Sequence, residues 1–134
     1  LQAPMPAIHT YGKSERLKSR KRIDAIFKTG QRVTMHPLLF IYRRHGDLPQ
    51  PALQAGVGVR SKQFRKAVDR NRIKRMIREA YRQQKAPLRD KVLQGRNSLD
   101  LFIIYTGQTM PLFEDIYARS GEALRKILEK YEAE

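Results

Sequence analysis

The segment DRNRIKRMIREAYR, residues 69–82, combines a high density of cations with a regular apolar pattern. Six of its fourteen residues are cationic, and Asp69 and Glu79 are its two acids. At about 100° per residue, a helix over this stretch is apolar on one side and carries cations or an amide elsewhere. The apolar stripe consists of Ile73, Met76, Ile77, Ala80 and Tyr81, and the residues opposite it are Asn71, Arg75, Arg78 and Arg82. The sequence therefore predicts a helix whose apolar side packs on a core.

Two explanations fit the cations of this helix: a well-solvated surface, or a surface that binds a polyanion. A solvated helix normally mixes charge signs, because like charges four residues apart destabilise it by a few tenths of a kcal/mol. Here the i, i+4 pairs Arg70/Lys74, Lys74/Arg78 and Arg78/Arg82 are all of like charge. A bound polyanion would relieve this repulsion, so we favour anion binding over simple solvation.

Composition narrows the class of protein. The 134 residues, 40% hydrophobic, suit one compact domain. The net charge of +15 attracts phosphates or anionic lipids, and we favour a nucleic acid. The absence of cysteine excludes disulfides, thiolate zinc sites and cysteine nucleophiles. Apolar runs are far shorter than the roughly 20 residues of a membrane-spanning helix, and the first residues do not resemble a secretory signal. We therefore expect a cytoplasmic protein with no membrane partner.

The charge is concentrated in two segments. Residues 13–32 carry 8 cations and 2 anions, and residues 60–85 carry 11 and 2, so their net charges of +6 and +9 equal the whole +15. A chain that is charged only for solubility does not need this segregation. We expect the two segments to form one basic surface.

Periodicity and turn residues predict two further helices. Ile23, Ile26 and Phe27 recur at helical spacing after Ser19, which is a suitable N-cap, and before Gly30, which is a suitable stop. A last helix is expected over about residues 112–131, with an apolar stripe along one side.

Three runs predict strands. They are LLFIYRR (38–44), ALQAGVGVR (52–60) and LDLFIIY (99–105). All three are rich in β-branched or apolar types, and the last is mostly apolar, so we expect it in the centre of a sheet. Strands that alternate with helices around one sheet predict an α/β two-layer sandwich.

This order of motifs resembles the bacterial ribonuclease P protein family. RNRIKRMIREAYR, preceded by VGVRSKQFRKAVD, matches the family's R-N-R-x-K-R helix after a strand. RIDAIFKTGQRV resembles its first helix and turn, LLFIYRR its early strand, and LDLFIIY its last strand before a C-terminal helix. The resemblance implies one RNA-binding domain over residues 16–134 after a flexible lead-in, residues 1–15. Residues 1–4 fit no element, and we expect them to be a remnant ahead of a native Met5.

The resemblance implies a fold and a function. The fold is an α/β (α+β) two-layer sandwich with about four strands and three helices, with an unusual left-handed βαβ crossover at the basic helix, as in the ribosomal protein S5 domain 2-like fold. The function is that of the protein subunit of ribonuclease P, which binds the catalytic RNA and the 5′ leader of precursor tRNA and assists removal of the leader. The chemistry would belong to the RNA and its Mg²⁺ ions, with no cofactor bound by the protein alone.

The resemblance also assigns site residues. RNA contacts fall on the basic helix and the loop before it: Arg70, Asn71, Arg72, Lys74, Arg75, Arg78 and Arg82, joined by Arg60, Lys62, Arg65 and Lys66. The leader would enter a cleft between the first helix and the sheet, with Phe27, Ile23 and Tyr42 as candidates. Ile23 stands where many members have a second aromatic residue, and Arg65 stands near a position that is often glycine.

The roles of the aromatic residues stay open from sequence. Phe27 is either a core aromatic or a leader contact, whereas a core position is favoured for Tyr42 and Tyr105. Whether Tyr42 or its neighbour Ile41 faces the cleft depends on strand register.

We expect no catalytic residue and no metal site in the protein itself. His9, His36 and His45 lie apart in the sequence, the acids are scattered, and no D-x-D or H-x-H pattern offers two ligands to one ion. Two other classes share the basic helix. A ribosomal-type or general structured-RNA-binding protein would bind many RNAs about equally well. A DNA-binding regulator would need a short helix and tight turn before the basic helix, which the sequence lacks, so we expect no DNA partner.

Overall fold

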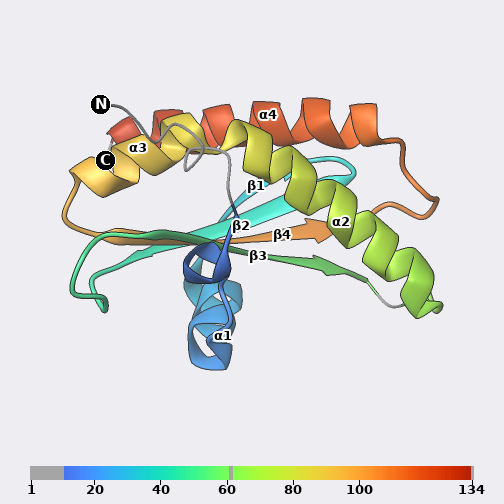
Figure 1. The fold of residues 1–134 in the computed structure, drawn as a ribbon, viewed down its shortest axis with the longest axis horizontal. Helices are drawn as coiled ribbons and strands as arrows, with labels where there is room; N and C mark the ends of the chain where they lie inside the picture. Colours follow the sequence, from blue (N-terminus) through green and yellow to red (C-terminus); the bar gives the residue numbers. More distant parts are fainter. Residues whose placement is uncertain (1–10, 61, 134) are drawn as a thin grey trace.

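The computed structural model describes residues 11–60 and 62–133, which form a four-stranded sheet with helices on both faces (Figure 1). In chain order the elements are η2 (Lys13–Glu15), α1 (Arg20–Thr29), β1 (Gln31–Met35), β2 (Leu38–His45), β3 (Leu53–Val59), α2 (Ala67–Gln84), α3 (Ala86–Gln94), β4 (Ser98–Tyr105) and α4 (Phe113–Ala133). Helices α2, α3 and α4 cover one face, and α1 lies on the other (Figure 1). The predicted α/β sandwich is confirmed, with four α-helices in the described part of the chain instead of three.

The strand order is β1-β2-β4-β3. Strand β4 pairs antiparallel with β2 and parallel with β3, so the apolar run LDLFIIY is central, as predicted. Adjacent parallel strands require a crossover connection, and here it runs through α2 and α3. The resemblance predicts the left-handed sense of this crossover.

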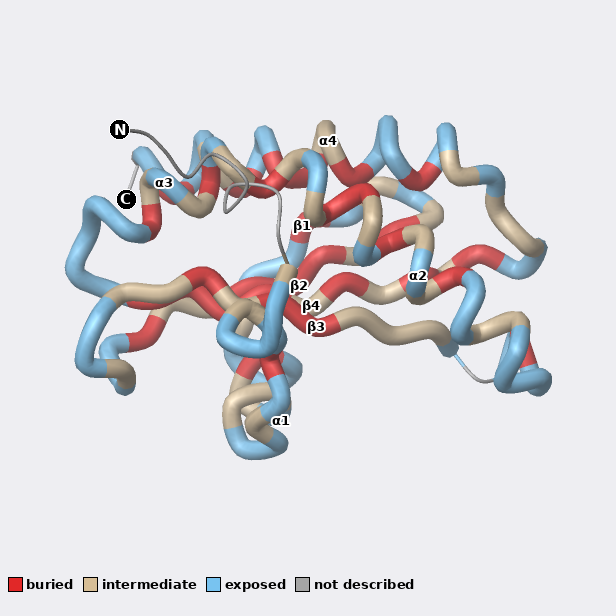
Figure 2. Tube along the Cα trace, viewed as in Figure 1, coloured by how far each residue is buried: buried red, intermediate tan, exposed pale blue. Residues whose placement is uncertain are grey.

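Two apolar clusters hold the layers together. The larger lies between the sheet and α2, α3 and α4, and the smaller contains Leu17, Ile26 and Ile41 beneath α1. Figure 2 shows the buried positions along the central strands and on the inward turns of α2 and α4. Because side chains alternate along a strand, neighbouring residues of β2 belong to different clusters.

The predicted ends of α1 are confirmed. Ser19 Oγ accepts a hydrogen bond from the backbone N–H of Arg22 at 3.2 Å, which satisfies one of the free amides of the first turn. Gly30 follows the last turn, and a Cβ there would lie 2.5 Å from the Ile26 carbonyl oxygen and 2.8 Å from Ile41 Cγ2. Only glycine fits this crossing of helix end and strand.

Three elements were not predicted from individual sequence patterns. Strand β1 lies at the sheet edge and buries only Val33, so its pattern is weak. Helix α3 begins directly after Lys85, with a proline in its first turn. Residues 11–15, which were assigned to a flexible lead-in, instead include η2 and pack along β3, where the Tyr11 hydroxyl donates to the Ala55 carbonyl. The predicted remnant at residues 1–4 and the rest of the lead-in up to residue 10 lie outside the described residues.

Candidate nucleic-acid interface

Helix α2 presents its cations to solvent. Ile73, Ile77, Ala80 and Tyr81 are buried and Met76 is half-buried, as the helical wheel predicts. The exposed residues of the helix include Asn71, Arg72, Arg75 and Arg78, and Lys74 is half-buried. The apolar side therefore anchors α2 to the sheet and leaves an arginine-rich outer side uncovered. We call Asn71, Arg72, Arg75 and Arg78 the outer side of α2.

Two arginines of α2 are engaged within the protein. Arg82 donates to both carboxylate oxygens of Glu79, with Nη2–Oε2 at 2.5 Å and Nε–Oε1 at 3.1 Å. Hydrogen bonds from Arg82 and Gln83 lower the pKa of Glu79 to about 2. Arg70 Nη1 donates to the carbonyls of Phe64 and Arg65, at 2.8 and 2.7 Å, and so holds the preceding loop. Arg82, which was predicted to contact RNA, is therefore already paired with an acid of its own helix.

The loop before α2 continues the basic surface. Arg60, Lys62, Arg65 and Lys66 are exposed. Phe64 is buried between them, with its ring centroid 5.9 Å from that of Tyr105. This anchor holds the loop cations at the N-terminal end of α2, where the helix dipole also favours anions.

The prediction that both basic segments form one surface is confirmed only at one edge of the sheet. Helix α1 and helix α2 lie on opposite faces of the sheet, because their apolar sides pack into different clusters (Figure 1). The two faces meet at the β3 edge, where Arg16 and Lys18 share a groove of about 330 Å³ with Arg78 of α2. The protein therefore has two basic faces that share one edge.

An aromatic pair marks the cleft between α1 and the sheet. Phe27 of α1 is 40% exposed, and its ring lies edge-on to Phe102 of β4, with centroids 5.3 Å apart. Ile23 is partly buried beside Phe102. Sequence reasoning did not select Phe102, although it alternates with the buried residues of β4. A Cβ at Gly56 would come within 2.8 Å of the Phe102 ring, so the residue of β3 beside this ring must lack a side chain.

The assignment of Tyr42 to the cleft is wrong. Tyr42 is 3% exposed and belongs to the cluster under α2 and α4, and its hydroxyl donates to Gln31 Oε1 at 2.9 Å. Ile41 faces α1 instead. The register that the sequence left open places the tyrosine on the opposite face of the sheet.

The described histidines are not brought together by the fold. His36 is exposed at the β1–β2 turn, His45 is buried, and His9 lies outside the described residues. Within residues 11–60 and 62–133, no group of three or more His, Asp or Glu side chains could hold a metal ion. Nor does this part of the chain contain a helix long and apolar enough to cross a membrane.

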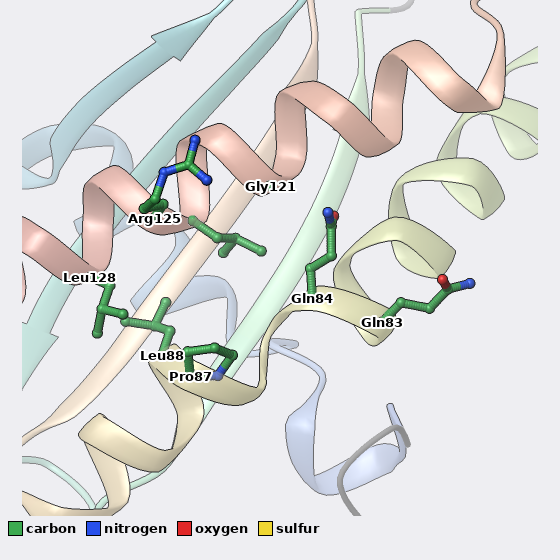
Figure 3. Close-up of a pocket in the computed structure, with 8 residues that line it drawn as sticks. Gln83, Gln84, Pro87, Leu88, Gly121, Arg125 and Leu128 are labelled. Atoms are coloured by element: carbon green, nitrogen blue, oxygen red, sulfur yellow. The ribbon is translucent and has the colours of Figure 1, made fainter.

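A groove of about 480 Å³ lies between α2, α3 and α4, and its lining contains no side chain that could act as a catalytic acid or base. It is lined by Gln83, Gln84, Pro87, Leu88, Gly121, Leu124, Arg125 and Leu128 (Figure 3). In this view the Gln84 side chain is directed toward α4, and that of Gln83 points away. The lining has no carboxylate and no histidine.

An exposed arginine helix on an α/β sandwich defines a basic nucleic-acid-binding protein. The chain belongs to the ribonuclease P protein family, because the family model Ribonuclease P matches residues 11–132. The ribonuclease P protein component of Porphyromonas gingivalis is 32% identical over 122 residues, covering 91% of this chain and 89% of the relative. That of Pseudoalteromonas atlantica is 37% identical over 94 residues, covering 69% and 76%.

Solved structures agree on the fold. The RNase P protein of Staphylococcus aureus superposes with a TM-score of 0.67 at 22% identity, covering 86% of this chain and 96% of that chain. The RNase P protein of Thermotoga maritima gives a TM-score of 0.56 at 25% identity, covering 87% and 96%. The chain is thus a protein subunit of ribonuclease P, an RNA-binding protein of tRNA processing and part of an endoribonuclease. The alternative of a general structured-RNA-binding protein is not favoured.

Proposed function

We propose that this protein docks on the RNA subunit of ribonuclease P through α2 and the loop before it, and receives the 5′ leader of precursor tRNA in the cleft beneath α1. Docking would place the cleft beside the active site of the RNA. The observation that carries the proposal is the uncovered outer side of α2, whose apolar side is packed on the sheet.

Arginine suits this role because its planar guanidinium can donate two parallel hydrogen bonds to one phosphate. Arg72, Arg75 and Arg78 are exposed along successive turns of α2, and the loop cations extend the surface. If the protein contacts six to ten phosphates, raising the salt concentration from about 50 to 200 mM should weaken binding roughly a thousandfold or more, by analogy with duplex DNA.

The cleft suits a single strand of nucleic acid. Stacking of a base on an aromatic ring contributes about 1–3 kcal/mol and tolerates any sequence. Phe27 is half-exposed beside Phe102 and is available for such stacking. Mature tRNA has no leader, so contacts in the cleft favour substrate over product.

The chemical step is assigned to the RNA subunit and its Mg²⁺ ions. The described residues hold no group of three or more His, Asp or Glu side chains that could bind a metal ion, which supports this assignment. The protein would contribute charge that reduces repulsion between the two RNAs and so lowers the Mg²⁺ requirement. It would bind no cofactor by itself, would act in the cytoplasm, and would have neither DNA nor a membrane as partner.

Reconstitution tests the proposal. The protein is combined with a bacterial ribonuclease P RNA at low Mg²⁺, and leader release from precursor tRNA is followed with and without protein. We expect cleavage that depends on the protein and resists an excess of unrelated structured RNA. Equal cleavage with and without the protein, or complete loss on adding the competitor, would contradict the proposal.

A further inference from the structure

We propose that Arg22, Asp100 and His45 form a positioning network that fixes α1 over the sheet and thereby sets the geometry of the leader cleft. The inference rests on the proposed function of that cleft. Arg22 of α1 binds Asp100 of β4 with both ends of its guanidinium fork: Nε donates to Oδ2 at 2.8 Å and Nη2 to Oδ1 at 2.7 Å. A side chain of the short first helix is thus bonded to the central strand.

The pair between Arg22 and Asp100 matters energetically because Asp100 is buried. Its carboxylate is fully buried, and the Arg22 side chain is 18% exposed. A buried carboxylate without a cationic partner is strongly disfavoured, so α1 cannot lift from the sheet without leaving Asp100 unpaired. Arg22 also donates to Gln54 of β3, which joins the helix to a second strand.

The apolar attachment of α1 is small. Of its ten residues only Ile26 is fully buried, one helical turn beyond Arg22. The main attachments of the helix are the Ile26 side chain in the small cluster and the Arg22 pair, and the partly buried Ile23 adds to the apolar contact. Phe27 follows Ile26 and rests against Phe102, so a shift of α1 would change the aromatic wall of the cleft.

His45 is a second potential partner for Asp100. Its side chain is 1% exposed, and its Nε2 lies 3.1 Å from Asp100 Oδ1 without the alignment of a hydrogen bond. Its Nδ1 accepts from the backbone N–H of Asp47 at 3.1 Å, and the Asp47 carboxylate lies 3.8 Å away. The charged groups around His45 thus include Arg22 from α1, Asp100 from β4 and Asp47 from the loop after β2. His45 therefore lies against the same carboxylate that Arg22 binds.

Hydrogen exchange of the free protein tests the anchoring. We expect Arg22→Met to speed exchange of the α1 amides about tenfold or more, because a buried charge has lost its partner, with no change in α4. Arg20→Met is the matched control, since Arg20 is an exposed arginine of the same turn, and it should leave α1 exchange unchanged. Wild-type exchange in Arg22→Met would overturn the proposal.

The reconstituted holoenzyme tests the consequence for substrate. The readout is the ratio of affinities for precursor tRNA and mature tRNA, with affinity for the RNA subunit measured in parallel. We expect Arg22→Met to reduce this ratio about tenfold without weakening RNA docking, and Arg22→Lys to restore part of it, because lysine keeps a positive charge beside the Asp100 carboxylate. An unchanged ratio in Arg22→Met would overturn the network's role.

The two measurements separate this inference from the proposed function. If the wild-type holoenzyme does not discriminate between precursor and mature tRNA, the leader-cleft function fails, whatever the exchange of α1. If the wild type discriminates and Arg22→Met does so equally well despite a loosened α1, the proposed function stands and the network's role in substrate choice fails.

Discussion

Phe27 of α1 and Phe102 of β4 meet edge to face across the cleft, with ring centroids 5.3 Å apart and planes inclined at 62°. The two residues are 75 positions apart in the sequence (102 − 27), and the fold of β4 against α1 brings them together. Phe27 keeps 40% of its surface exposed, more than a core position requires. It is therefore both a packing residue and an available stacking surface.

Replacing Phe27 by alanine is expected to reduce holoenzyme affinity for precursor tRNA by about tenfold, because one stacked base is worth about 1–3 kcal/mol. Affinity for mature tRNA and for the RNA subunit should be unchanged. Leu93→Ala is the control, because Leu93 is another exposed apolar residue and lies on α3, on the face of the sheet opposite α1. Equal losses for precursor and mature tRNA would show that Phe27 acts only through the fold.

Glu15→Gln is expected to destabilise the protein by about 3 kcal/mol, because the fully buried ammonium of Lys85 would lose its carboxylate partner. Urea unfolding monitored by circular dichroism measures the change. The control is Glu129→Gln, at an exposed position of α4. If both variants unfold at the same urea concentration, residues 11–15 do not contribute to the folded unit as described.

Gly30→Ala is expected to cost about 1–3 kcal/mol of stability or more, because a methyl group there would collide with the Ile26 carbonyl oxygen at 2.5 Å and with Ile41. The matched control is Gly12→Ala, where an added Cβ meets nothing within 4 Å. Thermal unfolding of the two variants should separate them clearly. Similar midpoints would contradict the close approach of α1 and β2.

The pair between Glu79 and Arg82 predicts a pH dependence of stability. The pKa of Glu79 is lowered from 4.5 to about 2, chiefly by the hydrogen bond from Arg82. The folded state therefore binds this proton less readily than the unfolded state, so the stabilisation is present above pH 4.5 and is lost as pH falls toward 2. Because the pair is largely solvated, the effect is small.

Glu79→Gln should reduce the slope of unfolding free energy against pH over this interval. Urea unfolding at several pH values compares it with wild type, and Glu122→Gln serves as the control for another i, i+3 pair. Identical slopes for Glu79→Gln and wild type would contradict the lowered pKa.

Features set by local pattern were predicted well from sequence. The stripe Ile73, Ile77, Ala80 and Tyr81 and the limits Ser19 and Gly30 follow from helical periodicity and capping, which need only neighbouring residues. Strand β4 was predicted to be central because its sequence is mostly apolar, and the strand order confirms this prediction.

Features set by long-range packing were not predicted. The choice between Ile41 and Tyr42 depends on a register that a run of apolar residues does not specify. The pair of Arg22 and Asp100 joins residues 78 positions apart. Charge segregation also did not reveal that α1 and α2 lie on opposite faces, because composition carries no information on which face a helix covers.

Binding of the RNA subunit to the outer side of α2 can be measured by titrating the protein with ribonuclease P RNA. Arg75→Glu with Arg78→Glu is compared with Lys126→Glu and Lys130→Glu, two exposed cations of α4 that give the same change in net charge. We predict that the α2 variant loses affinity for ribonuclease P RNA by about a hundredfold or more and shows a weaker salt dependence, with its circular dichroism spectrum unchanged, while the α4 variant stays within a few-fold of wild type. Wild-type affinity in the folded α2 variant, or an equal loss in both variants, would show that the outer side of α2 is not the binding site for the RNA subunit.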